Sequence, residues 1–240
     1  MRKLKLAIFI LLAGVGLAGL SSCNFNCVRG SGHQVTETRK VDDFTRIEIS
    51  GGFKVNLKQD SSLNIAITAD DNLLKYIKTK VEDGKLIIKT KRNLCNTSEM
   101  TLNIGIHKLE ELRSSGAIEV TGDGLITTKD LNFDLSGASK ITLDLNAANV
   151  TTTGSGATEL YLTGQASSHH INISGVGHIH AFDFVVGDYD IETSGAGDAE
   201  INVLHNLAVH SSGASEVKYK GNPSNVTNDK SGASSVEKVN

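Results

Sequence analysis

The 240-residue sequence contains no tryptophan, a single proline and only 5% aromatic residues, yet glycine occurs 24 times. The near absence of proline excludes the Pro/Gly-rich composition of a disordered chain. The lack of tryptophan removes the side chain that most often stacks against sugars in polysaccharide-active enzymes. Abundant glycine without proline instead favours many short strands joined by tight turns.

Basic charge is also scarce. The formal net charge is −3, and it becomes −6 without residues 1–22, which hold Arg2, Lys3 and Lys5 but no acid. A mildly acidic chain lacks the basic footprint of a nucleic-acid-binding protein. Nor does the sequence show a basic cluster that would predict a surface for binding anionic lipids.

The N-terminus has the pattern of an export signal. The basic start "MRKLK" is followed by the apolar run "LAIFILLAGVGLAGL" and the small residues "SSC". This order is typical of a cleaved secretory signal, and the apolar run is too short for a comfortable membrane span. Residues 1–22 are therefore predicted to be a signal peptide.

The segment "LSSC", Leu20 to Cys23, resembles the lipobox of bacterial lipoproteins. That resemblance implies acylation of Cys23 and cleavage before it, and several acyl chains on one residue anchor a protein that one chain would not hold. The alternative is an ordinary signal peptide whose cleavage region contains a cysteine. The membrane is thus an expected partner through Cys23.

Two further cysteines, Cys27 and Cys95, remain after Cys23. An exported chain folds in an oxidising compartment, where such a pair is a disulfide candidate. The alternative is two independent buried thiols.

A Ser-Gly pair recurs along most of the chain at intervals of 18 to 21 residues, a signature of a repeat architecture. Its glycines, predicted to form structural turns, are Gly116, Gly137, Gly156, Gly175, Gly195, Gly213 and Gly232. An eighth copy places Gly51 65 residues earlier, roughly three periods away.

Alignment on these glycines gives alternating apolar and polar columns, as in half-buried strands. The fourth residue after each glycine is apolar: Val120, Ile141, Leu160, Ile179, Ala199, Val217 and Val236. The third is mostly charged: Glu119, Lys140, Glu159, His178, Asp198, Glu216 and Ser235. An ordinary β-sandwich would show turns every 8–12 residues without identical corners.

These columns predict an all-β fold, a right-handed parallel β-helix with coils of about 19–20 residues in which equivalent residues stack. Glycine at each corner can adopt positive φ without steric cost. We expect the alanine that follows it to point inward at a tight corner. The serine before it is expected to hydrogen-bond the turn.

The predicted organisation has three parts: the signal peptide 1–22, a lipidated N-terminus and linker 23–40, and a β-helix domain 41–240. Within this domain, residues 41–110 form irregular first coils and 111–240 the regular repeats. A hairpin turn is expected at Asp83-Gly84. In the last coil Asn228 and Lys230 replace apolar residues, as in a capping repeat.

The segments "DFTRIEISGGFKVNLKQ", "DDNLLKYIKTKVEDGKLIIKTK", the serial "SGA" corners and "VKYKGNP" together resemble the putative auto-transporter adhesin, head GIN domain family. The resemblance extends from about Val41 to the C-terminus. It implies a lipid-anchored or secreted right-handed β-helix from Bacteroidota, adhesin-like by shape, with no catalytic residues or cofactor. Surface lipoproteins of that phylum usually carry acids soon after the lipidated cysteine. Here the first acid is Glu37, which favours the periplasmic leaflet of the outer membrane over the cell surface.

Few residues suggest chemistry. His178 and His180 share one face of a strand, and the stacked columns place Glu159 and Tyr161 before them and Asp198 and Glu200 after them. Imidazole and carboxylate groups can bind transition metals, so His178, His180, Asp198 and Glu200 are weak metal candidates. The alternative is an exposed charged ladder.

The sequence therefore predicts a non-enzymatic envelope lipoprotein that presents a rigid interaction surface to an unidentified protein or glycan, with homo-oligomers possible. The alternatives are a ligand- or metal-binding module that uses the His/acid ladder and, more remotely, a polysaccharide-active enzyme. The short periods leave no room for the long loops that wall the grooves of such enzymes.

Overall fold

The computed structural model describes residues 27–95 and 97–240 of the chain. Cys23 and the predicted signal peptide lie outside these residues. The described part is all-β apart from one 3-10 helix, η1 (Leu74–Tyr76). Its strands are β1 (Val28–Arg29), β2 (Gln34–Lys40), β3 (Arg46–Gln59), β4 (Asn64–Asp70), β5 (Ile77–Glu82), β6 (Lys85–Thr90), β7 (Leu94–Cys95), β8 (Thr101–Ile106), β9 (Glu111–Thr127), β10 (Asp130–Lys220), β11 (Asn225–Gly232) and β12 (Ser235–Lys238).

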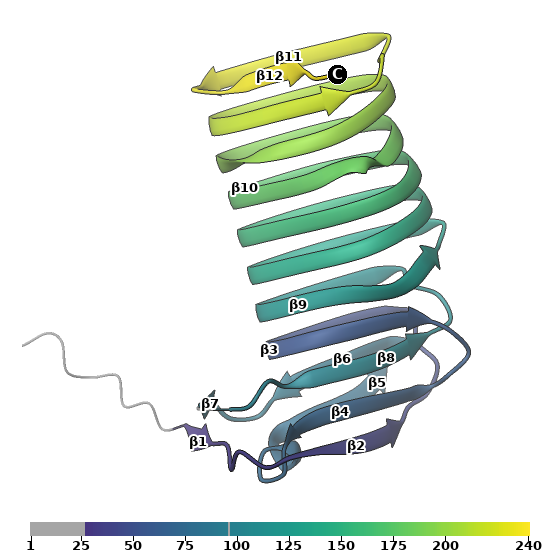
Figure 1. Ribbon diagram of the computed structural model, residues 1–240, viewed down its shortest axis with the longest axis vertical. Coiled ribbons are helices and arrows are strands. Elements are labelled where there is room, and N and C mark those ends of the chain that lie inside the picture. Colours follow the sequence, from purple (N-terminus) through teal and green to yellow (C-terminus); the bar gives the residue numbers. More distant parts are fainter. Residues whose placement is uncertain (1–26, 96) are drawn as a thin grey trace, which may run out of the picture.

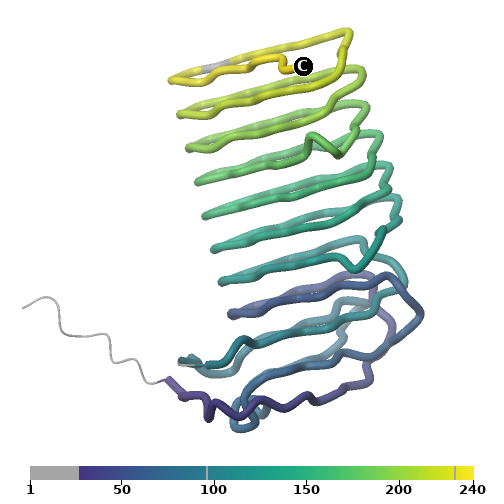
Figure 2. The backbone as a smooth tube through the Cα atoms, in the orientation of Figure 1, coloured from purple at the N-terminus to yellow at the C-terminus, as the bar shows by residue number. Residues whose placement is uncertain are grey.

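The 91-residue strand β10 winds around a common core in successive circuits, each of which we call a coil (Figures 1 and 2). The coils follow β9 below and lead to β11 and β12 above. Pairing between them is parallel and in register, with Gly116 beside Gly137 and Gly213 beside Gly232. Like residues therefore lie above like residues.

The corner glycines approach one another so closely that no side chain fits between them. All seven have positive φ, from 85° at Gly137 to 148° at Gly195. A Cβ added to any of them would lie only 2.1 to 2.5 Å from the carbonyl oxygen of the corner glycine in the preceding coil. Both the backbone conformation and the stacking thus require glycine.

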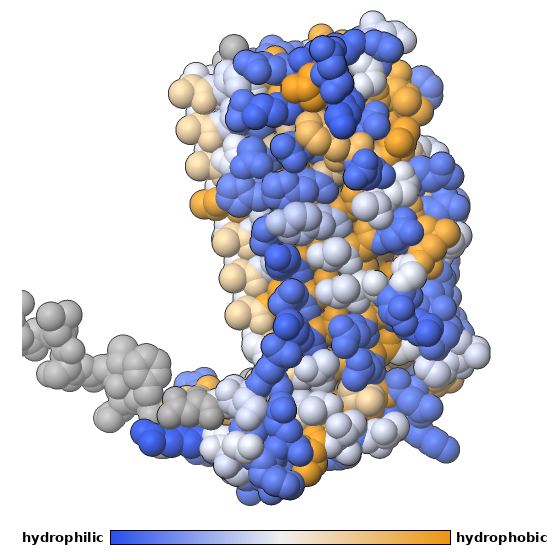
Figure 3. Space-filling model, viewed as in Figure 1, coloured by the Kyte–Doolittle hydropathy of each residue, from blue (hydrophilic) through white to orange (hydrophobic). Residues whose placement is uncertain are grey.

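The prediction that the alanine after each glycine points inward is wrong. Ala117, Ala138 and Ala157 are exposed, whereas the buried positions near the corner are two residues before and after the glycine, such as Leu135 and Ser139. The positive φ of glycine interrupts the alternation of a regular strand, so serine, glycine and alanine all face outward. The alanines form an exposed column, visible as pale-orange atoms along the left edge of the stack in Figure 3.

Gly51 is not three coils away from Gly116, as its interval of 65 residues suggested. β3 pairs directly with β9, so Gly51 lies beside Gly116. The intervening residues leave the stack, build the N-terminal end of the molecule and return. On one flank β3 is followed by β6 and β5, and on the other by β8, β4 and β2.

This N-terminal end, which we call the end cap (β2, β4, η1, β5, β6 and β8), is built from antiparallel pairs, and its strands β6 and β8 pair in parallel with β3. The predicted hairpin joins β5 to β6, with Asp83 and Gly84 at φ 50° and 70°. Arg39 from β2 closes the end of the core, because its guanidinium donates to the carbonyl oxygens of Ile77 (2.8 Å) and Leu74 (3.3 Å). The cap and the coils share one hydrophobic core.

Candidate functional site

One flank of the stack carries two outward columns of polar side chains, three and five residues after each corner glycine. We call this flank the ladder face. The first column contains Lys54, Glu119, Lys140, Glu159, His178, Asp198 and Glu216, and the second contains Thr121, Thr142, Tyr161, His180, Glu200 and Lys218. Strand alternation directs both columns outward, because Val120, Ile141 and their equivalents between them are buried.

Side chains of successive coils contact each other along the ladder face. Lys140 Nζ lies 3.9 Å from Glu159 Oε2 and 5.0 Å from the centre of the Tyr161 ring. The Tyr161 hydroxyl donates to Glu159 Oε1 at 2.5 Å, and this hydrogen bond raises the pKa of Tyr161. The Tyr161 ring stacks on His180 with 4.6 Å between ring centres.

The structure places the four metal candidates in two separate pairs. His178 Nδ1 contacts Asp198, and His180 Nδ1 lies 3.2 Å from Glu200 Oε2. Each imidazole therefore faces one carboxylate of the next coil. Within residues 27–95 and 97–240, no three His, Cys, Asp or Glu side chains gather closely enough to hold a metal ion.

A groove of about 580 Å³ runs along the edge of the ladder face, beside the exposed alanine column. Ala117, Ala138, Ala157 and Val176 line one side of it. The segment 97–100 closes one end, where Lys54 Nζ lies 3.0 Å from Glu99 Oε2. This contact raises the pKa of Lys54, first through its hydrogen bond with Glu99. The groove thus combines a small-residue wall with charged side chains of both signs.

The flank before each corner glycine carries a second set of paired polar groups. Arg113 Nε lies 2.9 Å from Asp134 Oδ2, and His170 Nδ1 lies 3.1 Å from Asp190 Oδ2. This flank has its own groove of about 460 Å³ around Asn172, Glu192 and His210, which Arg113 and Asp134 do not line. The Arg113–Asp134 pair therefore offers a matched control for binding experiments.

His169 is fully buried. Its Nε2 lies 2.9 Å from Thr152 Oγ1, whereas its Nδ1 is among the buried atoms without a partner in the described part of the chain. The rings of Phe184 and Tyr189 lie against it. Burial lowers the pKa of His169 to about 3, with a smaller contribution from His170.

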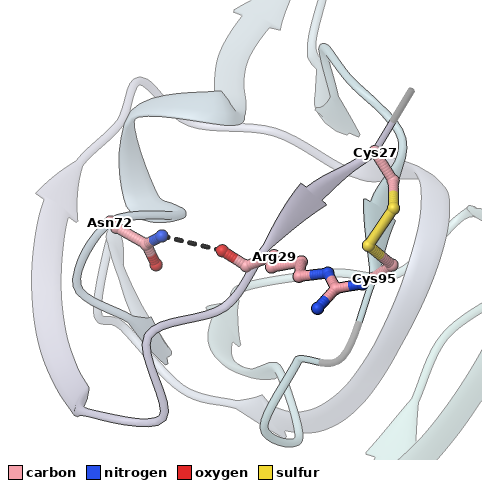
Figure 4. The surroundings of a disulfide bond; sticks show 4 residues. All are labelled: Cys27, Arg29, Asn72 and Cys95. Carbon is pink, nitrogen blue, oxygen red and sulfur yellow. Dashed lines mark hydrogen bonds between the residues drawn. A yellow bond between two sulfur atoms is a disulfide. The ribbon is translucent and has the colours of Figure 1, made fainter.

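Cys27 and Cys95, the candidate pair, are joined by a disulfide with Cα atoms 5.8 Å apart (Figure 4). The bond holds β1 beside β7, where only two residue pairs form a parallel ladder. Asn72 also holds this segment, because its Nδ2 donates to the carbonyl oxygen of Arg29 at 2.8 Å. The start of the described chain is therefore fixed to the end cap. Cys23, the lipidation candidate, precedes it by four residues.

A group of exposed lysines on the β5–β6 hairpin was not among the predicted site residues. Lys78 on β5 pairs directly with Lys89 on β6, and Lys91 follows β6. The signal was present, because the Asp83-Gly84 turn fixes the hairpin register and thereby the pairing of Lys78 with Lys89. Lys89, Lys91 and Arg92 already form a short basic run in the sequence, "KTKR", to which the turn adds Lys78.

No helix among the described residues is both long and apolar enough to cross a membrane. The fold itself has solved counterparts. An adhesin described as putative, from Bacteroides fragilis, aligns over 88% of this chain and 100% of its own with a TM-score of 0.81 and 21% identity. Another, from Parabacteroides merdae, aligns over 89% and 99% with a TM-score of 0.65 and 23% identity.

A protein from Parabacteroides distasonis described as a putative lipid binding protein aligns over 89% of this chain and 99% of its own, with a TM-score of 0.64 and 19% identity. The comparison with curated proteins found no match. One family profile, described as putative auto-transporter adhesin, head GIN domain, matches residues 43–223. The chain therefore belongs to this family.

Proposed function

We propose that the chain is a right-handed parallel β-helix that serves as a non-enzymatic, adhesin-like lipoprotein of the cell envelope. The in-register parallel pairing of β3, β9, β10 and β11 supports the β-helix. Its right hand follows from the strong preference of parallel crossover connections. Membership of an adhesin-like family supports the interaction role.

The observation that carries this proposal is the ladder face with its groove. A stacked sheet changes shape little on binding, so the ladder face offers a preformed surface several coils long. Its charged groups alternate in sign and are already paired with neighbours, as in Lys140–Glu159 and His180–Glu200. Such groups suit recognition of a protein or glycan more than acid–base catalysis, which needs a carboxyl group poised to transfer a proton.

Acylation of Cys23 would attach the protein to the outer membrane. The absence of acids between Cys23 and Glu37 favours the periplasmic leaflet. Two measurements test this placement. Cells grown with labelled palmitate should label the wild-type chain and not a Cys23→Ser variant. Protease treatment of intact cells should leave the protein intact, whereas digestion would place it on the cell surface.

The interaction role is tested by paired variants of equal charge. Lys140→Ala/Glu159→Ala removes one ion pair from the ladder face, and Arg113→Ala/Asp134→Ala removes one from the opposite flank. Wild-type protein should bind members of a glycan array or of a panel of immobilised cell-envelope proteins, and only the first variant should lose that binding. Equal loss in both variants, or no binding by the wild type, would argue against the ladder face.

The metal-binding alternative is tested separately. Titration calorimetry with Zn²⁺ and Ca²⁺ should give no heat at micromolar metal, because each histidine of the ladder face contacts its own carboxylate. Heat that disappears in a His178→Ala/His180→Ala variant would favour a metal-binding module instead.

A further inference from the structure

The charges of the chain are divided between its two ends. Residues 27–95 contain 13 Lys and Arg against 9 Asp and Glu, a net charge of +4. Residues 96–240 contain 8 Lys and Arg against 18 Asp and Glu, a net charge of −10. The first group comprises most of the end cap, and the second most of the coils. The N-terminal end of the molecule is therefore positively charged although the chain as a whole is negative.

The positive charge is concentrated on the β5–β6 hairpin. Lys78 on β5, Lys89 on β6 and Lys91 just after β6 are exposed, and we call these three residues the lysine cluster. Lys78 and Lys89 stand directly opposite each other, an arrangement that destabilises a sheet when the charges are alike. Among the described residues, no carboxylate lies within ion-pair distance of these three lysines.

The lysines are also close enough for the charge of one to affect the pKa of another. The nearby Lys78 ammonium group lowers the pKa of Lys91. Lys75 on η1 and Arg92 after β6 are also exposed, and the Lys91 backbone N–H donates to the carbonyl oxygen of Tyr76, the residue after Lys75. Several other lysines of the molecule are paired, for example Lys54 with Glu99 and Lys58 with Asp123. An unpaired group of cations with such mutual repulsion is stabilised when an anionic surface covers it.

The cluster lies at the end of the molecule to which the predicted anchor is attached. β5 pairs only with β6, so it is the last strand of its flank at the N-terminal end of the stack (Figure 1). Lys91 precedes Cys95 by four residues, and Cys95 is bonded to Cys27. A chain of four residues, such as that from Cys23 to Cys27, spans at most about 14 Å. An acylated Cys23 would therefore hold the end cap close to the bilayer.

We propose that the lysine cluster is a membrane-docking surface that binds the phosphate groups of anionic phospholipids. The molecule then stands on its end cap, with the acidic coils directed away from the negative surface. This orientation rests on the proposed acylation of Cys23, whereas the affinity of the cluster for anionic lipid does not. A lipid anchor combined with a basic patch is a pair of signals that retains proteins stably on membranes.

The affinity is tested in the full chain with Cys23→Ser, so that acyl chains do not dominate the result. Its sedimentation is measured with vesicles of phosphatidylethanolamine and phosphatidylglycerol and with vesicles of phosphatidylcholine alone. The leader contributes to binding through its apolar run and through Arg2, Lys3 and Lys5, equally in the parent and in its variants, so the comparison between variants isolates the cluster. Binding to the anionic vesicles should be stronger and should weaken when NaCl is raised from 0.1 to 0.5 M.

Three substitutions, Lys78→Gln, Lys89→Gln and Lys91→Gln, should together reduce binding to the anionic vesicles by about 100-fold, since each lysine near such a surface contributes about fivefold. The matched control, Lys129→Gln/Lys220→Gln/Lys238→Gln, removes the same charge from the coils and should bind like the parent. Removal of like charges should leave the hairpin folded, and thermal unfolding checks this. Equal losses in the two variants, or salt-independent binding, would overturn the proposal.

The orientation is tested with the acylated wild-type chain in the same vesicles, by amine labelling and mass spectrometry. Lys78, Lys89 and Lys91 should be protected several-fold in anionic vesicles, while Lys220 and Lys238 stay reactive. Equal reactivity of the two groups would refute docking through the cap. The intact mass of the same sample reports acylation, so failure of the anchor is distinguished from failure of the cluster.

Discussion

The buried histidine makes the stability of the protein depend on pH in a way that can be calculated. His169 is enclosed by Phe184 and Tyr189 and accepts or donates a single hydrogen bond, to Thr152. Its pKa is lowered from 6.5 to about 3 by burial. Between these two values the unfolded chain binds a proton that the folded chain does not.

The sign follows from linkage. The free energy of unfolding rises with pH wherever the unfolded state binds more protons than the folded state. Above pH 6.5 His169 is neutral in both states and has no effect, and below pH 6.5 it destabilises the folded state increasingly as the pH falls. The slope is about 1.36 kcal/mol per pH unit, and the full effect between pH 6.5 and 3 is about 5 kcal/mol. Between pH 6.5 and 5 the wild type should lose about 2 kcal/mol through this residue alone.

Urea unfolding at several pH values tests this value by comparing the wild type with Thr152→Val/His169→Leu, which removes both partners of the hydrogen bond. The variant should lack this part of the pH dependence, so the difference between the two unfolding free energies should change by about 2 kcal/mol from pH 6.5 to 5. His205→Leu, at an exposed histidine, is the control and should follow the wild type. Parallel curves for wild type and double variant would refute a neutral, buried His169.

Further predictions concern the corners, the disulfide and the cap. Gly156→Ala should lower the free energy of unfolding by about 3 kcal/mol or more in urea denaturation, because φ is 103° and the new Cβ would lie 2.4 Å from the Gly137 carbonyl oxygen. Ala157→Ser changes the next residue, which is exposed, and should alter the free energy of unfolding by less than about 0.5 kcal/mol. A larger loss would indicate that the alanine points inward after all. Reduction of the Cys27–Cys95 disulfide, which spans 68 residues, should lower the free energy of unfolding by up to about 4 kcal/mol, because the unfolded chain gains loop entropy. Calorimetry with and without reductant measures this loss, and an unchanged midpoint of thermal unfolding would contradict it. Arg39→Met should accelerate hydrogen exchange in β5, since the carbonyl oxygens of Leu74 and Ile77 lose their donor; unchanged exchange would show that the cap closes without it.

The repeat was predictable because its physical cause is local and recurs. A glycine that must have positive φ and must allow a close backbone approach leaves the same residue at the same place in each coil. The alternating columns then identify the buried positions, such as Ile141 and Leu160. The Asp83-Gly84 hairpin was predictable for a similar reason, since its turn needs two residues that tolerate positive φ.

The failures have a different origin. Strand alternation is a rule for regular backbone, so it gave the wrong direction for Ala138, which follows a glycine that departs from that rule. The adjacency of Gly51 and Gly116 depends on pairing between distant segments, for which an interval in sequence carries no information. The burial of His169 could have been predicted, because it lies six residues before Gly175 and the residues at that position in the neighbouring coils, Val150 and Tyr189, are buried.

The detour of the chain between β3 and β9 bears on the order in which the protein can fold. Everything that the N-terminal end needs, from β2 to β8, precedes β9 in the chain, and an exported chain enters its folding compartment with the N-terminus first. That end can therefore complete its own interior early and offer the edge of β3 as a template. Each later circuit then needs only the one before it, so assembly can proceed in one direction, as the polypeptide lengthens.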